Sequence, residues 1–269
     1  MSLVRLGLCC SRAEGFRWDA QSSLRNAVQF LQISQDDEEE GDGGLLSLSP
    51  LDGSAEDLEE SLLEATDQGL THLFFLSPGA LLPFYSLQRL IDLRVPAVGG
   101  ISWTWRPGAS GEDPEIFPRI GYFDGEGRPY PYFGWSAPDI FEVDWCGLDC
   151  LLLERDAIER IIEPLRILRG RDPALRISLA LRSLGIPIRV DSFVQCPQVI
   201  TLPSGARKLI PSPGAWLEFS RDCSARRLPR GSVFDPSYRG RVWYRDWVKR
   251  CLTERTRSDT ELLPADPVI

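Results

Sequence analysis

Short apolar runs alternate with amphipathic stretches over the first hundred residues of the chain. Apolar runs typical of buried strands lie at Leu3 to Leu8, at Leu45 to Ser49 and in the HLFFL segment that begins at His72. The pattern predicts one helix between the first two runs. It predicts another from Ser54 to Gly69, where a capping serine precedes the leucines of one face and a glycine follows the end. Because parallel strands need such crossover helices, this half is predicted to be Rossmann-like.

The second half of the chain repeats this alternation with one longer interruption. Helices are predicted over 84–93, 158–165 and 173–184, and strands at VPAVGG, 141–145, 151–153 and IPIRV. Between 102 and 138 many glycine, proline and aromatic residues predict loops and short antiparallel strands. We therefore expect an α/β fold, with a Rossmann-like mixed sheet and helices on both faces. The prediction is a single domain over residues 1–220, with an irregular, arginine-rich C-terminal extension over 221–269.

Charge and cysteine content narrow the functional classes. The formal net charge of -9 argues against nucleic-acid binding over the whole surface, although the arginines between 221 and 257 suit an anionic ligand or an acidic partner. Seven cysteines without paired spacing favour a reducing compartment. We see no run of roughly 18 apolar residues and no signal-peptide pattern. The expectation is a cytoplasmic protein without a transmembrane segment.

Three stretches of the chain carry a resemblance to a known family. They read THLFFLSPGALLPFYSLQRLIDLRVPAVGG, FEVDWCGLDCLLLERDAIERI and RDPALRISLALRSLGIPIRVD, and they lie between residues 71 and 191. In order and pattern they resemble glycosyltransferases of the GT-A fold, of the family 2 type. The resemblance implies a GT-A-like domain that transfers a sugar from a nucleoside diphosphate sugar to an acceptor, which the sequence does not identify.

The usual metal-binding residues of that family are missing. Where the family has an Asp-x-Asp motif after the strand equivalent to HLFFL, this chain has Ser77, Pro78 and Gly79. The place of a metal-ligating histidine is taken by residues 194–196, which read VQC. Mg²⁺ and Mn²⁺ bind carboxylate oxygens, which these residues do not offer. We expect no conventional site for either cation, so another group has to neutralise the leaving diphosphate.

Two substitutes for the cation are consistent with the sequence. Ser77 and Pro78 can open a helix, in which case backbone N–H groups around Gly79 would face a phosphate. The alternative is an arginine clamp from the C-terminal stretch, because a guanidinium binds phosphate oxygens in two-pronged fashion. Arg106 is placed to reach a phosphate as well. The competing interpretation of Ser77 to Gly79 is a plain turn, with the next helix beginning only after Pro83.

Two aspartates are candidates for the catalytic carboxylate. Asp172 matches the acidic residue that opens the third stretch, and the resemblance implies that it takes the proton of the acceptor hydroxyl. Its alternative role is to cap the following helix, with Pro173 at the first helical position. Asp144 is the second candidate, as a residue lining the acceptor pocket, and its alternative role is to close an exposed strand.

Aromatic and N-terminal residues complete the candidate site. Trp103, Trp105 and Trp145 are predicted to stack on a sugar ring, with Tyr130, Tyr132 and Trp135 extending the same surface. Core packing is the alternative for each ring. Ser11 and Arg12 follow the first strand, where a nucleotide lies in folds of this layout.

The sequence thus favours an enzyme of the hexosyltransferase type, with a nucleotide sugar and an unknown acceptor as partners and without a conventional metal site. The alternative is a catalytically inactive relative that serves as a binding or assembly subunit.

Overall fold

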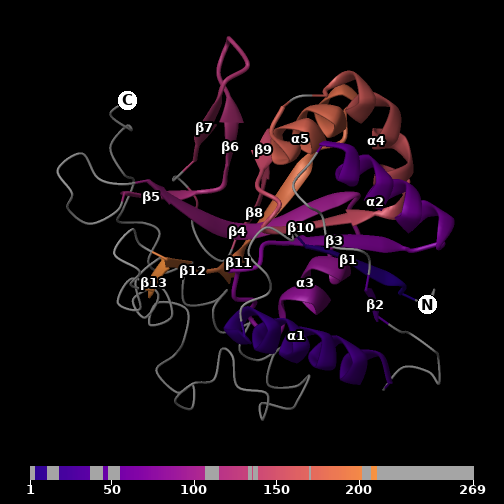
Figure 1. Cartoon of the computed structure of the whole chain (residues 1–269), viewed down its shortest axis with the longest axis vertical. Coiled ribbons are helices and arrows are strands. Elements are labelled where there is room, and N and C mark those ends of the chain that lie inside the picture. Colours follow the sequence, from indigo (N-terminus) through magenta and orange to yellow (C-terminus); the bar gives the residue numbers. More distant parts are fainter. Residues whose placement is uncertain are drawn as a thin grey trace.

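The fold is described from a computed structural model, over residues 4–10, 18–36, 45–47, 55–106, 115–132, 135, 139–169, 171–201 and 207–210. These residues form a mixed sheet with helices on both faces (Figure 1). The fold is therefore the mixed α/β, Rossmann-like arrangement that the alternating pattern predicts. Residues 211–269, which include the predicted C-terminal extension, lie outside the described residues.

The strands of the main sheet follow the order β2-β1-β3-β10-β4-β11-β8, and β5 pairs with the far part of β4. Parallel pairing joins β1 to β2 and to β3, as predicted for the N-terminal half. In contrast, β10 lies antiparallel between β3 and β4. The bounds are β1 (Leu6–Cys10), β2 (Leu45–Ser47), β3 (His72–Leu76), β4 (Ala97–Arg106), β5 (Glu115–Pro118), β8 (Ile140–Val143), β10 (Cys150–Glu154) and β11 (Ile188–Cys196).

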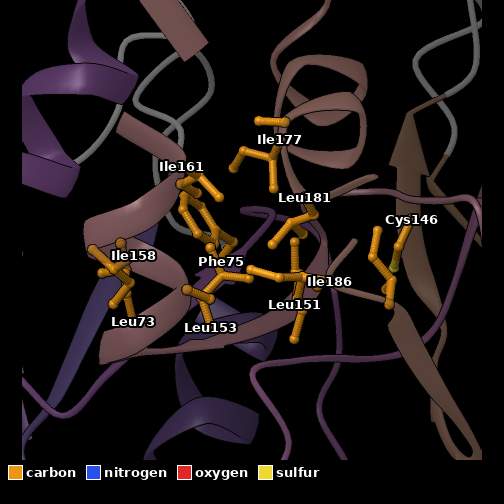
Figure 2. Packing of buried hydrophobic residues seen from close by; sticks show 14 of the residues in the cluster. Leu73, Phe75, Cys146, Leu151, Leu153, Ile158, Ile161, Ile177, Leu181 and Ile186 are labelled. Carbon is orange, nitrogen blue, oxygen red and sulfur yellow. The ribbon is translucent and has the colours of Figure 1, made fainter. Parts of the chain in front are cut away.

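Each face of the sheet is covered by its own helices. One face carries α1 (Trp18–Asp36) and α3 (Ser86–Asp92), and the other carries α2 (Ala55–Asp67), α4 (Arg155–Ile167) and α5 (Pro173–Ser183) (Figure 1). On the second face, Phe75, Leu151 and Leu153 of the sheet pack against the isoleucines and leucines of α4 and α5 (Figure 2). None of the helices in the described part of the chain combines the length and apolar character that membrane crossing requires.

A buried ion pair joins the three helices of that face. Arg176 of α5 is fully buried and donates from Nη2 to Glu59 Oε1 of α2 at 2.8 Å and to the Leu165 carbonyl of α4 at 2.9 Å. Arg169 adds a contact to Glu59 Oε2 at 3.1 Å. Hydrogen bonding from Arg169 and then from Arg176 lowers the pKa of Glu59 below its usual value. The helical layer is thus held together by charge as well as by apolar packing.

The predicted strand at VPAVGG continues well past its two glycines, because β4 extends to Arg106 and pairs there with β5. A Cβ on Gly99 would lie 2.7 Å from Cys146 Sγ, and one on Gly100 would lie 2.6 Å from Val194. These glycines therefore leave room for Cys146 and Val194 to pack closely against β4, and they do not end the strand.

Two smaller sheets flank the main one. A three-stranded sheet contains β6 (Ile120–Phe123), β7 (Pro129–Pro131) and β9 (Trp145–Cys146), and the β6–β7 hairpin projects from the body (Figure 1). Strands β12 (Gln198–Thr201) and β13 (Arg207–Ile210) form the other sheet. The prediction of short antiparallel strands between 102 and 138 is confirmed for β5, β6 and β7.

Candidate functional site

The carboxyl ends of β1 and β3 define the first feature of the candidate site. The chain leaves β1 to form β2 on one side and returns to form β3 on the other, so the strand order reverses at this point. In open α/β sheets, ligands bind in the crevice outside the carboxyl ends of the strands at such a switch point. The register aligns Cys10, Leu76 and Cys150, so β10 begins at the edge where β1 and β3 end. We call this edge of the sheet the carboxyl edge.

Ser77, Pro78 and Gly79 form a turn at this edge. Ala80 N donates to the Ser77 carbonyl at 3.1 Å, and α3 begins only at Ser86. The competing interpretation of a plain turn is therefore what the structure shows, and no helix starts at Ser77. The N–H groups of Ala80, Leu81 and Leu82 all donate to protein acceptors. These three N–H groups are therefore already hydrogen-bonded within the protein, unlike the free N–H groups of a helix N-terminus.

The segment between β11 and β12 closes one side of this turn. Val199 N donates to the Gly79 carbonyl at 2.9 Å, and Leu81 N donates to the Pro197 carbonyl at 2.8 Å. A Cβ on residue 79 would lie 3.0 Å from the Val199 carbonyl oxygen, so glycine permits this approach. The neighbour of Gly79 on this side is therefore main chain.

A buried carboxylate that the sequence reasoning missed stands next to the turn. Asp149 immediately precedes Cys150, which pairs with Leu76, the residue before Ser77. Asp149 Oδ2 accepts from Ser102 Oγ at 3.1 Å and lies 3.1 Å from Arg119 Nε, and Oδ1 accepts from Arg119 Nη1 at 3.3 Å. The carboxyl edge therefore carries an oriented arginine as well as an acid.

Main-chain contacts fix this pair in place. Arg119 N donates to the Ser102 carbonyl at 2.8 Å, and Gly147 N donates to the Arg119 carbonyl at 2.7 Å. A Cβ on residue 147 would lie 2.7 Å from Asp149 Oδ2 and 2.8 Å from Arg119 Nε. Glycine at 147 thus lets the ion pair lie directly against the backbone. The CGLD sequence before the apolar run of β10 was the one available signal of this arrangement.

Cys146, Cys150 and Cys196 are buried around the glycines of β4 and the end of β11. Burial, the largest cause, raises the pKa of Cys146 and that of Cys196 well above the usual range, so both are protonated thiols near neutral pH. Val194, Gln195 and Cys196, at which the resemblance predicts the loss of a metal-ligating histidine, are all buried in β11. In the described part of the chain, no group of three or more His, Cys, Asp or Glu side chains is arranged to hold a metal ion.

The chain has a single histidine, and it lies at the opposite edge of the sheet. His72 begins β3 and pairs with Leu6, the first residue of β1. Burial lowers the pKa of His72 to about 4. A histidine general base is therefore excluded at the carboxyl edge, and a carboxylate remains the candidate base.

Asp172 is exposed and caps α5. Its Oδ1 accepts from Ala174 N at 3.0 Å and from Leu175 N at 3.2 Å, with Pro173 at the start of the helix. The capping role is what the structure shows, and both contacts use the same oxygen. Because α5 leads into the amino end of β11, its N-terminus points back toward the carboxyl edge. The second oxygen, Oδ2, is not part of the cap.

Asp144 lies far from the turn at Ser77. It follows Val143, which pairs with the first residue of β11, and four strand spacings or about 19 Å separate β8 from β3. Its Oδ2 accepts from Phe123 N at 3.0 Å and contacts Arg182 Nη1 at 3.0 Å. The structure therefore does not bring Asp144 together with Ser77, and its contacts join the small sheet to α5.

The predicted aromatic surface is a contiguous row of rings. It leads from Trp103 on β4 to Trp135 at 6.0 Å between centroids, and then through Tyr132 and Tyr122 to the half-exposed Tyr130. Trp145 lies beside the row, and its Nε1 donates to the Tyr130 carbonyl at 3.2 Å. Trp103 also packs against the core, which is the alternative role given for its ring.

Some predicted site residues fall outside this description. Ser11 and Arg12 lie outside the described residues, as do the side chains of Trp105 and Arg106, whose backbones pair with β5. Of the predicted residues, Ser77 and Gly79 therefore share the carboxyl edge with the unpredicted Ser102, Arg119 and Asp149.

Comparison with known proteins identifies no family. No family model matches the chain, and no curated protein matches it. Among solved structures, it is similar to the crystal structure of A197 from STIV, with 16% identity, a TM-score of 0.43 and coverage of 78% of this chain and 94% of that one.

Two enzymes of nucleotide chemistry are also among the similar structures. One is 4-diphosphocytidyl-2C-methyl-D-erythritol synthase from Anaerococcus prevotii, with 12% identity, a TM-score of 0.38 and coverage of 80% and 96%. The other is UTP-bound UGPase from Acinetobacter baumannii, with 7% identity, a TM-score of 0.38 and coverage of 97% and 100%. Likeness at this level does not assign a function, which has to be argued from the residues of this chain.

Proposed function

We propose that this protein binds a nucleoside diphosphate sugar at the carboxyl edge and transfers the sugar to an acceptor hydroxyl, without a cation held by an Asp-x-Asp motif. One observation carries the proposal. The three stretches that resemble family 2 glycosyltransferases supply the adjacent strands β3, β10, β4, β11 and β8 of the main sheet. The carboxyl edge of that sheet includes the topological switch point, where this class of sheet binds its ligands.

The proposed chemistry needs a proton acceptor and a group that stabilises the leaving diphosphate. In an inverting transfer, a carboxylate takes the acceptor proton while the bond from the sugar to the diphosphate breaks. We assign the proton to Asp172 Oδ2, because Oδ1 alone accepts the two capping hydrogen bonds. Capping would then fix the side chain in one rotamer and leave the second oxygen for the acceptor hydroxyl.

Calorimetric titration with UDP- and GDP-sugars tests the proposal. Each donor is titrated into the full chain with Mn²⁺ and again with EDTA. The expected result is saturable binding of at least one donor, with an affinity that EDTA leaves unchanged. Absence of binding to every donor under both conditions would end the proposal.

A second candidate is a catalytically inactive relative that acts as a binding or assembly subunit. The observation in its favour is that Ser77, Pro78 and Gly79 offer no carboxylate and that residues 194–196 are buried. Such a protein binds the donor without consuming it. Release of free nucleotide on addition of candidate acceptors would rule this candidate out.

A further inference from the structure

Arg119 is oriented at the carboxyl edge but only partly covered. The Asp149 side chain is 6% exposed, whereas that of Arg119 is 31% exposed. A guanidinium carries five N–H donors, and the contacts of Arg119 with Asp149 use Nε and Nη1. Nη2 takes no part in these contacts with Asp149. The partly exposed guanidinium therefore has N–H donors left for a further acceptor.

The other buried arginine pairs differ from this one. Arg89 contacts Asp191 and lies 4.7 Å from the centre of the Phe193 ring, with its side chain only 14% exposed. Arg176 is fully enclosed between α2 and α5. Neither guanidinium is open to a ligand. Arg119 combines contacts to Asp149 with partial exposure, and Asp149 immediately precedes β10 at the carboxyl edge.

The geometry points to Arg119 as the residue that binds the diphosphate of the nucleotide ligand, with Asp149 as its positioning residue. The identity of the ligand rests on the proposed function. A guanidinium is always charged and can bind two phosphate oxygens at once, so it can take over part of the role of the missing cation. Asp149, held by Ser102 and seated against Gly147, fixes the plane of the fork before the ligand arrives.

The test measures affinity for UDP, GDP, inorganic pyrophosphate and uridine in the presence of EDTA, with the wild-type chain and with Arg119→Met. Loss of two charge-assisted hydrogen bonds is expected to weaken UDP binding by about tenfold to a hundredfold. Uridine has no phosphate, so its affinity should not change. Arg119→Lys keeps the charge without the fork and is expected to lie between the wild type and the methionine variant.

Three further variants separate binding from folding. Arg128→Met is the matched control, because Arg128 is an exposed arginine that pairs with Asp124 and Glu126 at the hairpin tip. It should bind UDP as the wild type does. Asp149→Asn and Gly147→Ala leave Arg119 in the chain but disturb its orientation. Both should weaken UDP binding several-fold and leave uridine binding unchanged, with melting curves recorded for every variant.

The outcomes distinguish this inference from the proposed function. If the wild type binds UDP or GDP and Arg119→Met binds it equally well, the inference is wrong and the proposed function stands. An equal loss for UDP and uridine would show a structural role for Arg119 and would also overturn the inference. If the wild type binds only pyrophosphate, and does so through Arg119, the anion site stands and the nucleotide-sugar proposal does not.

Discussion

Replacing Asp172 by alanine and, separately, by asparagine separates the two roles assigned to this side chain. Oδ1 of Asp172 accepts both capping hydrogen bonds, from Ala174 N and Leu175 N. Asparagine keeps an oxygen for the cap and places an amide nitrogen where Oδ2 stands. Alanine removes both oxygens. The two variants therefore differ in helix capping and agree in the loss of a proton acceptor.

The expected magnitudes follow from these contacts. Loss of an N-cap costs about 1 kcal/mol, within a range of about 0.5–2 kcal/mol, whereas asparagine caps about as well as aspartate. The missing charge at the helix N-terminus adds only a few tenths of a kcal/mol at an exposed site. Asp172→Ala should therefore be about 1 kcal/mol less stable than the wild type, and Asp172→Asn should remain close to it. Urea unfolding followed by circular dichroism measures the difference.

The activities of the two variants should not follow their stabilities. If Asp172 is the base, nucleotide release should fall by about a hundredfold or more in both variants, because a positioned base contributes about 10²–10⁴ in rate. Equal destabilisation by alanine and asparagine would refute the capping argument. Wild-type turnover in Asp172→Asn would refute the assignment of the base, whatever the stability of the variant.

Three other predictions concern the fold. The pKa of His72 is lowered to about 4, so the unfolded chain takes up the proton first as the pH falls below 6.5. The free energy of unfolding should therefore decrease toward pH 4 by up to about 3 kcal/mol. Urea unfolding at each pH should show this decrease in the wild type and not in His72→Gln. Glu59→Gln leaves Arg176 buried without its carboxylate and should cost about 3 kcal/mol in the same assay, whereas a change under 1 kcal/mol would contradict the buried pair. A Cβ on Gly121 would lie 1.9 Å from the Tyr130 carbonyl, so Gly121→Ala should speed amide exchange in β6 and β7, while Gly125→Ala, with open space around it, should not.

Local sequence signals were sufficient to predict strand bounds and helix ends where one residue type determines the local structure. HLFFL forms β3 with the predicted bounds, because a continuous apolar run lies between polar Thr71 and the Ser77 turn. The end of α5 was predictable because Gly185 adopts a positive φ of 66°, which other residues rarely adopt. Asp172 followed by Pro173 indicated the start of α5, because an aspartate caps a helix well and a proline suits the first helical position.

The direction of β10 and the Arg119–Asp149 pair lay beyond those signals. An apolar run such as CLLLE has the same pattern whichever way the strand runs, and the direction depends on how the chain enters it from β9. Arg119 and Asp149 are 30 residues apart, and their contact depends on the packing of Gly147 against both. Sequence reasoning left open backbone N–H groups at Ser77, a C-terminal arginine clamp or a plain turn, and the Arg119–Asp149 pair emerged only from the tertiary structure.

The position of β10 between β3 and β4 has a consequence for how the chain folds. These two strands precede β10 by many residues, yet they do not pair with each other. During synthesis, therefore, β3 and β4 lack the strand that joins them until residues 150–154 are made, and β11, the other partner of β4, follows later. Arrival of that one strand joins β3 to β4 and delivers Asp149 to Arg119 in the same event. A nascent or truncated chain that ends before Cys150 is consequently exposed to edge-to-edge aggregation, and chaperone binding should be most needed at this stage of translation.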